Sequence, residues 1–150
     1  MTKVSLVCSS GGHFFELYSL DAFWKEMDRF WVTFPGADTK SLLRGEKIYW
    51  GYCPTNRNIK NFIRNLFLAF NILRSERPDI VVSTGAGLGV PFIYVAKLMR
   101  IKTIYIDSIT FTERISLTGK LVYFVADRFL VQWPELTRKY KKAEFRGTVL

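Results

Sequence analysis

Short apolar runs alternate with longer stretches of helical periodicity along the whole chain, and this alternation is the strongest constraint on its fold. The apolar runs predict strands at residues 3–8, 29–34, 47–50, 79–83, 102–107 and 128–132. The intervening segments predict helices at residues 14–27, 38–44, 58–75, 88–100 and 116–126. Crossovers between parallel strands are right-handed almost without exception, so the pattern predicts an α/β fold with a doubly wound, Rossmann-like parallel sheet. Because no linker or repeat interrupts it, we expect one domain over residues 1–150.

Charge and composition narrow the class of partner. The chain has 22 Lys and Arg against 13 Asp and Glu, a net charge of +9, and 16% of its residues are aromatic. A basic surface favours nucleic acid, phospholipid headgroups or a phosphorylated substrate, and surplus aromatic residues are typical of surfaces that meet a protein or a bilayer. With one histidine and two cysteines outside any metal-type spacing, we expect no metal and no cofactor.

The apolar stretches are too short for membrane insertion. The run at residues 4–8 is shorter than a signal peptide requires, and the longest stretch, residues 85–99, is interrupted by Lys97. We therefore expect a cytoplasmic protein that contacts the inner face of the plasma membrane peripherally.

The fold class nominates a site before any coordinates are known. In doubly wound sheets, ligands bind in the crevice beyond the carboxyl ends of the strands. The segments leaving those ends are residues 9–13, 35–38, 84–89, 108–114 and 133–135. At this rim lie the only histidine, His13, and the acid–base candidates Asp107 and Glu113. These three residues are the catalytic candidates.

The first glycine-rich turn follows the first predicted strand and reads Ser10-Gly11-Gly12-His13. Two glycines permit a tight turn and expose N–H groups that can bind a phosphate. His13 can then act as a base or as a phosphate donor. A plain strand-to-helix turn is the alternative interpretation.

The second glycine-rich turn, residues 84–89, opens the helix after the fourth predicted strand. It fails the dinucleotide fingerprint because Val90 occupies the last position, and it fails the P-loop pattern because no Lys-Ser or Lys-Thr follows. The turn still permits close approach of the backbone to a phosphate or sugar, so Thr84, Gly85 and Gly87 are binding candidates. Helix–sheet packing is the alternative.

The predicted helix at residues 58–75 is more apolar than one buried stripe requires. A core stripe accounts for Ile59, Ile63, Leu66, Phe70 and Leu73. It does not account for the additional apolar residues Phe62, Phe67, Leu68 and Ala69. A basic helix with a wide apolar face suits a membrane interface. The membrane-docking candidates are therefore Phe62, Arg64, Phe67 and Arg74, with core packing as the alternative.

Several motifs, taken in order, resemble a known family. They are Ser10–His13 with Glu16, residues 83–87 with Val90-Pro91, and residues 116–123 followed by Ala126-Asp127 and residues 131–133. This order resembles the PssD-type glycosyltransferase enhancers of bacterial exopolysaccharide and capsule biosynthesis. Those proteins are related to the eukaryotic subunit that anchors the split UDP-GlcNAc transferase of N-glycan assembly.

The resemblance implies a fold similar to the N-terminal half of GT-B glycosyltransferases, which binds a lipid-pyrophosphate acceptor while the other half binds the nucleotide-sugar. It implies a polyprenyl-pyrophosphate-linked sugar acceptor, a donor-binding partner chain of the PssE type and transfer from a UDP-sugar. Family members carry Glu-Ser and an Arg soon after the fifth strand, whereas this chain has Asp107-Ser108 and, further on, Glu113-Arg114. Arg114 is accordingly an acceptor-binding candidate.

One Rossmann-like layer leaves no room for a nucleotide-sugar site, so we expect activity only with a partner chain. Trp133, Pro134 and residues 145–150 are the candidates for that contact. A stand-alone Rossmann-type nucleotide-binding enzyme is the first alternative, although both diagnostic glycine patterns fail. A basic nucleic-acid-binding module is the second, but the basic residues are dispersed and no recognition motif is visible, so we expect no nucleic acid.

Overall fold

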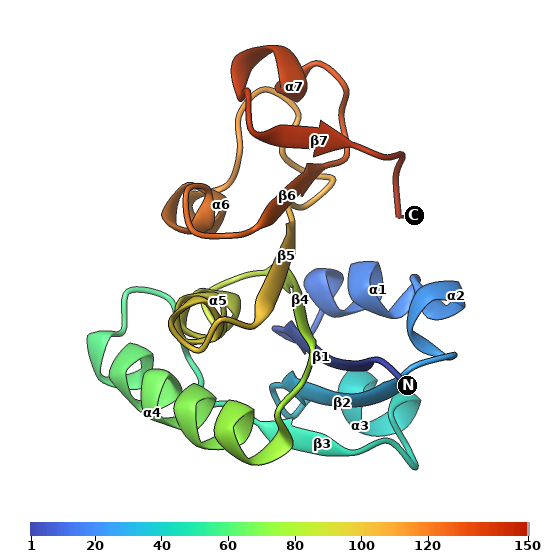
Figure 1. Ribbon diagram of the computed structural model, residues 1–150, viewed down its shortest axis with the longest axis vertical. Coiled ribbons are helices and arrows are strands. Elements are labelled where there is room, and N and C mark those ends of the chain that lie inside the picture. Colours follow the sequence, from blue (N-terminus) through green and yellow to red (C-terminus); the bar gives the residue numbers. More distant parts are fainter. Residues whose placement is uncertain (150) are drawn as a thin grey trace.

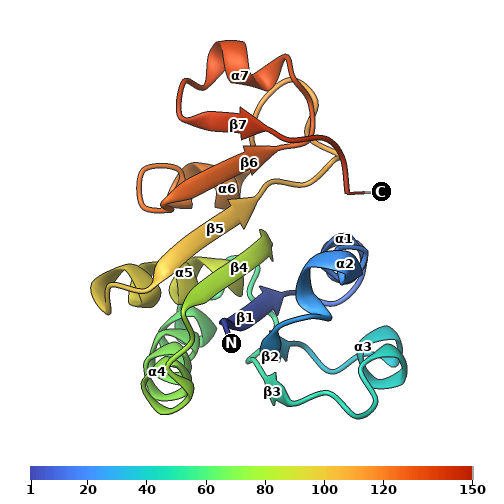
Figure 2. The same cartoon turned by 45° about the vertical axis from the view of Figure 1, so that its right-hand side comes forward.

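The computed structural model describes residues 1–149, which form a seven-stranded sheet in the order β3-β2-β1-β4-β5-β6-β7 (Figure 1). Every neighbouring pair of strands is parallel, and Figure 2 shows the strands running in one direction. The order reverses between β1 and β4, which confirms the doubly wound sheet. The strands are β1 (Lys3–Cys8), β2 (Asp28–Thr33), β3 (Ile48–Trp50), β4 (Ile80–Gly85), β5 (Lys102–Ile106), β6 (Arg128–Val131) and β7 (Ala143–Phe145).

The helices cover both faces of this sheet. They are α1 (Gly12–Tyr18), α2 (Asp21–Trp24), α3 (Ala37–Leu42), α4 (Ile59–Glu76), α5 (Gly89–Leu98), α6 (Leu117–Val122) and α7 (Leu136–Lys139). Helices α4, α5 and α6 lie on one side of the sheet, and α1 and α2 lie on the other (Figure 1).

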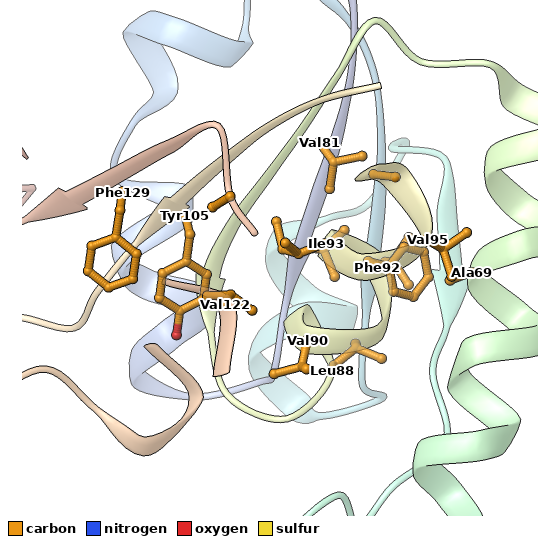
Figure 3. Packing of buried hydrophobic residues seen from close by; sticks show 14 of the residues in the cluster. Ala69, Val81, Leu88, Val90, Phe92, Ile93, Val95, Tyr105, Val122 and Phe129 are labelled. Carbon is orange, nitrogen blue, oxygen red and sulfur yellow. The ribbon is translucent and has the colours of Figure 1, made fainter. Parts of the chain in front are cut away.

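Each face of the sheet has its own apolar core. On the α5 side, Phe92 and Ile93 are fully buried and pack over Val81 of β4 (Figure 3). On the α1 side, the indole of Trp31 lies at the centre of an aromatic cluster, with ring centroids 5.8 Å from Phe14 and 5.3 Å from Trp24. Because helix α5 is buried on nearly all sides, it fixes the positions of the loops that follow β4 and β5.

The prediction of a single helix at residues 14–27 is wrong, because this segment forms the two short helices α1 and α2. The indole Nε1 of Trp24 donates to the carbonyls of Leu17 and Tyr18, at 3.2 Å each. A continuous helix would need these carbonyls for its own next turn. The Trp24 side chain therefore stabilises the end of α1.

Two further differences lie near the carboxyl end of the chain. The helix predicted at residues 116–126 ends earlier, with α6 spanning Leu117–Val122. The sequence pattern missed α7 and β7, which have four and three residues. Elements this short have too few residues to show a hydrophobic period.

Helix α4 faces the core with a different side from the one expected. Ile59, Ile63 and Phe70, assigned above to a core stripe, are exposed. The residues that face inward are Asn61, Asn65, Ala69, Ile72, Leu73 and Glu76. Hydrogen bonds to the segment after β3 explain this rotation, because the Asn65 amide accepts from Tyr52 N at 2.9 Å and donates to Tyr52 O at 3.0 Å. Asn61 Nδ2 likewise donates to Pro54 O at 2.8 Å.

Candidate functional site

A groove with a volume of about 540 Å³ lies beyond the carboxyl ends of the strands, at the switch point predicted from the fold class. Helices α4, α5 and α6 supply its apolar walls through Phe62, Val90, Leu117 and Leu121, and Phe111 adds to them. Its polar lining comes from His13, Thr55, Asn56, Arg57, Ser116 and Thr118, together with the backbone at Ala86 and Gly87. The groove therefore combines an apolar wall with hydrogen-bonding groups and a cation.

His13 lines this groove and is held by Thr84. Its Nδ1 lies 3.0 Å from the carbonyl oxygen of Thr84, and Thr84 Oγ1 donates to the carbonyl of His13 at 2.6 Å. Because a carbonyl only accepts, Nδ1 carries the proton in this contact. In the neutral ring Nε2 is then the acceptor. The structure thus brings together His13 and Thr84, which lie on the two glycine-rich turns.

The first glycine turn already has a partner for one of its N–H groups. Gly11 adopts φ +86°, and its N–H donates to Asp38 Oδ2 at 2.8 Å. The second oxygen of Asp38 accepts from Thr39 N at 2.8 Å. A carboxylate at Gly11 disfavours a phosphate there, so Ser10, which is half-buried, and Gly12, which is exposed, are the open positions of this turn. Sequence reasoning missed Asp38, although it lies in a segment leaving a strand end.

The second glycine turn packs closely and still borders the groove. Gly85 has φ +112°, and a Cβ there would lie 2.6 Å from the hydroxyl of Tyr105. A Cβ on Gly87 would lie 2.6 Å from Cβ of Thr55. Packing therefore requires both glycines. The turn leads into the amino end of the ten-residue helix α5, a position that favours an anion in the groove.

Asp107 is buried beneath the groove rather than lining it, with 1% of its surface exposed. Its Oδ2 accepts from Ser116 N at 2.9 Å and its Oδ1 from Ser116 Oγ at 2.5 Å. Burial raises the pKa of the Asp107 carboxyl above its ordinary value, and the hydrogen bonds from Ser116 offset part of that effect. This placement favours a role in positioning α6.

The structure does not bring Glu113 and Arg114 to His13. Both side chains are exposed, and neither lines the groove. The backbone carbonyl of Glu113 accepts a hydrogen bond from Lys139 Nζ at 3.3 Å. Phe111 and Ser116, on either side of these two residues, do line the groove.

A buried carboxylate, Glu16, supports the loop after β5. Glu16 Oε1 accepts from Ser108 Oγ at 3.1 Å and from Ile109 N at 3.0 Å. From the other side, Trp133 Nε1 donates to Ile109 O at 2.7 Å. The loop that carries Phe111 is thus held at both of its faces. The one available signal was the place of Glu16 in the family-like motif.

The membrane-docking candidates lie on the outward side of α4. Phe62 is 38% exposed and Phe67 is 68% exposed. Arg64 stacks over the ring of Tyr52 at 4.7 Å, and Arg74 lies 6.0 Å from the ring of Phe70. The one acidic residue of α4, Glu76, is buried, so the exposed charges of this helix are all basic. Among residues 1–149, no helix combines the length and apolarity needed to cross a bilayer.

The two partner-contact candidates differ in placement. Trp133 is half-buried against the core and donates to Ile109 as described, whereas Pro134 is exposed. Of the predicted contact segment 145–150, Leu150 lies outside the described residues. Within residues 1–149, no group of His, Cys, Asp or Glu side chains is arranged to hold a metal ion.

Solved structures with the same fold include MurG and a UDP-GlcNAc 2-epimerase. MurG from Acinetobacter baumannii matches with a TM-score of 0.83 at 16% identity, over 100% of this chain and 46% of that one. The UDP-GlcNAc 2-epimerase from Methanocaldococcus jannaschii matches with a TM-score of 0.75 at 14% identity, over 98% and 46%. At these identities the likeness establishes the Rossmann-like fold alone.

Sequence comparison identifies closer relatives, each described as UDP-N-acetylglucosamine transferase subunit ALG14. The human protein is 31% identical over 94 residues, which are 59% of this chain and 44% of the relative. The Eremothecium gossypii protein is 32% identical over 127 residues, which are 77% and 55%. This chain spans about half the length of these two curated relatives.

The family assignment depends on the carboxyl-terminal two thirds of the chain. Residues 52–149 match the family described as "Oligosaccharide biosynthesis protein Alg14 like". The matched range contains α4, the second glycine turn and the motif at residues 116–123, all of which contribute to the groove. This chain belongs to the Alg14-like family of oligosaccharide biosynthesis proteins.

Proposed function

We propose that this chain is the acceptor-binding, membrane-docking subunit of a heteromeric glycosyltransferase that extends a lipid-linked sugar. The relatives are named as subunits of a UDP-N-acetylglucosamine transferase, which supports both the reaction class and the subunit role. The acceptor is a sugar linked through pyrophosphate to a polyprenyl chain, and the donor is a UDP-sugar held by a second chain. The pathway is exopolysaccharide or capsule biosynthesis, and the second chain is of the PssE type.

The groove is the observation on which this proposal depends. A lipid-pyrophosphate sugar needs an apolar wall for its chain, donors for its phosphates and a base near its hydroxyl. Phe62, Leu117 and Leu121 supply the wall, and Arg57 with the amino end of α5 supplies charge complementarity to pyrophosphate. Phe62 belongs both to the groove and to the outward side of α4, so the lipid has a short route from a bilayer.

His13 is the base in this proposal. As the acceptor hydroxyl bonds to the anomeric carbon of the UDP-sugar, the bond from that carbon to the phosphate oxygen breaks and UDP leaves with the electron pair. His13 Nε2 takes the hydroxyl proton, since Nδ1 is engaged with Thr84. Asp107 is less suited to the task because it is buried and both of its oxygens accept from Ser116.

Helix α4 is the membrane-docking element of the proposal, acting at the cytoplasmic face of the plasma membrane. Its exposed apolar side chains include Phe62 and Phe67, and the nearby exposed charges Arg64 and Arg74 suit anionic headgroups. The buried Asn61 and Asn65 support this orientation, because their hydrogen bonds hold the polar side of the helix inward.

The test is transfer of labelled sugar from a panel of UDP-sugars to a polyprenyl-pyrophosphate-linked acceptor. The assay uses this chain alone, the product of the neighbouring gene alone and the two mixed. We expect turnover only in the mixture. Robust turnover by this chain alone would overturn the proposal in favour of a stand-alone enzyme.

A further inference from the structure

A continuous series of hydrogen bonds between hydroxyl groups connects the buried carboxylate of Asp107 to the groove. The Tyr105 hydroxyl lies 2.9 Å from Thr118 Oγ1, and Thr118 Oγ1 lies 3.2 Å from Ser116 Oγ. Ser116 Oγ donates to Asp107 Oδ1 at 2.5 Å. Tyr105, Ser116 and Asp107 are buried, whereas Thr118 is half-buried and lines the groove.

The number of protons and lone pairs on each hydroxyl group determines which partner donates in each of these hydrogen bonds. A hydroxyl has one proton to donate and two lone pairs to accept with. Ser116 Oγ donates its one proton to the Asp107 carboxylate and accepts a hydrogen bond from Gly119 N at 2.9 Å. In the hydrogen bond between Ser116 and Thr118, Thr118 must therefore be the donor. Thr118 then has no proton for Tyr105, so Tyr105 donates to Thr118. The protons therefore run from Tyr105 to Thr118, to Ser116 and to Asp107.

This direction leaves Thr118 Oγ1 as an acceptor toward the groove. Its proton is committed to Ser116 and one lone pair to Tyr105, while no group among residues 1–149 uses the second lone pair. A hydroxyl in that state repels a phosphate oxygen and attracts an O–H or N–H group. It differs in this respect from Arg57, which also lines the groove and only donates.

We propose that Thr118 Oγ1 accepts a hydrogen bond from a hydroxyl or amide N–H group of the acceptor sugar, with Ser116 and Asp107 as its positioning residues. The inference rests on the proposed function, and it adds an orientation to it. The sugar group lies at Thr118, at the α6 end of the groove, and the pyrophosphate lies toward Arg57, which supplies the positive charge.

The experiment measures binding of two probes to the full chain by titration calorimetry. One probe is farnesyl pyrophosphate, and the other is farnesyl pyrophosphate carrying one N-acetylglucosamine on the terminal phosphate. The readout is the ratio of the two Kd values, which cancels any loss of folded protein common to both. We expect wild type to prefer the sugar-bearing probe by about tenfold, the scale of one added hydrogen bond.

Substitutions then distinguish the contribution of the Thr118 hydroxyl from that of the neighbouring hydroxyl groups. Thr118→Val should reduce the preference to near one, while Thr118→Ser should retain it. Tyr105→Phe is the matched control, since it removes a buried hydroxyl of the same series and leaves Thr118 as an acceptor. The double variant Tyr105→Phe with Thr118→Val covers the case in which an unpaired Tyr105 hydroxyl unfolds the single variant.

Asp107→Asn tests the donor–acceptor direction of these hydrogen bonds. Ser116 N–H needs an oxygen opposite it, which places the new amide NH₂ group against Ser116 Oγ. Ser116 must then donate to Thr118, and Thr118 becomes a donor toward the groove. The preference for the sugar-bearing probe should be lost although Thr118 is unchanged.

The remaining outcomes contradict either the inference about Thr118 or the proposed function. If wild type binds both probes equally, or if Thr118→Val or Asp107→Asn keeps the tenfold preference, the inference is wrong and the proposed function stands. If wild type binds neither probe, the groove is not a lipid-pyrophosphate site, and the proposed function is overturned together with the inference.

Discussion

The two ends of the sheet each bury a carboxylate, and the surroundings of these two groups differ. At the amino ends of the strands, Glu76 pairs with Lys3 Nζ at 2.6 Å and also contacts Lys47 Nζ and the Tyr49 hydroxyl. Burial by itself would raise its pKa, but these three partners outweigh burial and lower the pKa of Glu76 to about 2. At the carboxyl ends, Asp107 has its side-chain partners in Ser116, and burial raises its pKa.

This difference indicates that Glu76 contributes to stability, whereas Asp107 contributes to ligand recognition. Lys3 and Lys47 neutralise Glu76, so its charge serves to join α4 to the first and third strands. Within residues 1–149, no Lys or Arg side chain pairs with Asp107, and its carboxylate instead fixes the protons of neighbouring hydroxyl groups. Both ends are well packed, and at the carboxyl end Thr118 keeps hydrogen-bonding capacity directed at the groove that His13 also lines.

The largest expected effect is on stability at the amino end. Glu76→Gln should lower the free energy of unfolding by roughly 2 to 3 kcal/mol at pH 7, because one pKa unit corresponds to about 1.4 kcal/mol. The pKa of Glu76 is about 2 in the folded chain, below its ordinary 4.5. The stabilisation is thus complete above about pH 4.5 and is lost as the pH falls through about 2. Urea unfolding of both proteins at pH 7 and pH 3 measures the difference, which should narrow at the lower pH.

Glu144→Gln is the matched control for Glu76. Glu144 pairs with Arg128 at 2.5 Å, but 34% of its side chain is exposed, and exposed ion pairs contribute little. Its substitution should change the unfolding free energy by less than about 1 kcal/mol. Equal losses for the two variants would show that the network around Glu76 has no special role.

The next effect concerns activity at the carboxyl end. His13→Ala should lower kcat of the assembled complex by about 10²-fold, the usual scale for loss of a general base, with little change in urea unfolding. Asp107→Asn, measured in parallel, should change KM for the acceptor more than kcat. Near wild-type kcat for His13→Ala would remove His13 from the mechanism, and a larger kcat loss for Asp107→Asn would return the role of base to the carboxylate.

The contrast between the two ends was only partly predictable from the sequence. Hydrophobic alternation predicted the sheet and therefore placed His13 and Thr84 at the same rim, where they form two hydrogen bonds. That inference needs only strand periodicity and the geometry of parallel sheets. The network around Glu76 was not predictable, because it joins residues from three elements whose side-chain directions depend on packing.

The orientation of α4 was the clearest failure of periodicity. Apolar residues extend from the exposed side of this helix, at Ile59 and Phe70, to its buried side, at Ala69 and Ile72, so hydrophobic spacing alone does not select the buried side. The side is selected by Asn61 and Asn65, whose amides pair with the backbone at Pro54 and Tyr52. Such pairs between a side chain and a distant backbone segment leave no periodic signal in the sequence. Asp38 was missed for the same reason, since its contact with Gly11 spans 27 positions.

A smaller effect tests α4, the helix that runs from the groove to Glu76. Phe62→Ser combined with Phe67→Ser should weaken sedimentation with anionic vesicles by roughly tenfold, because partial burial of two phenyl rings is lost. Phe145→Ser is the control, since Phe145 is a 40% exposed phenylalanine on β7, outside this helix. Unchanged sedimentation of the double variant would mean that another surface meets the bilayer.

The smallest expected effect separates charge from apolar contact on the same helix. Arg64→Gln should weaken binding to anionic vesicles by about fivefold at low salt, since one basic residue near the surface contributes roughly 1 kcal/mol. The difference should disappear at high salt, where headgroup attraction is screened, whereas the phenylalanine effect should persist. Arg138→Gln, an exposed arginine of α7, is the control and should bind like wild type. Equal losses for the two arginine variants would show that net charge attracts the chain to vesicles without a defined docking side, and the outward side of α4 would then lose its assigned role.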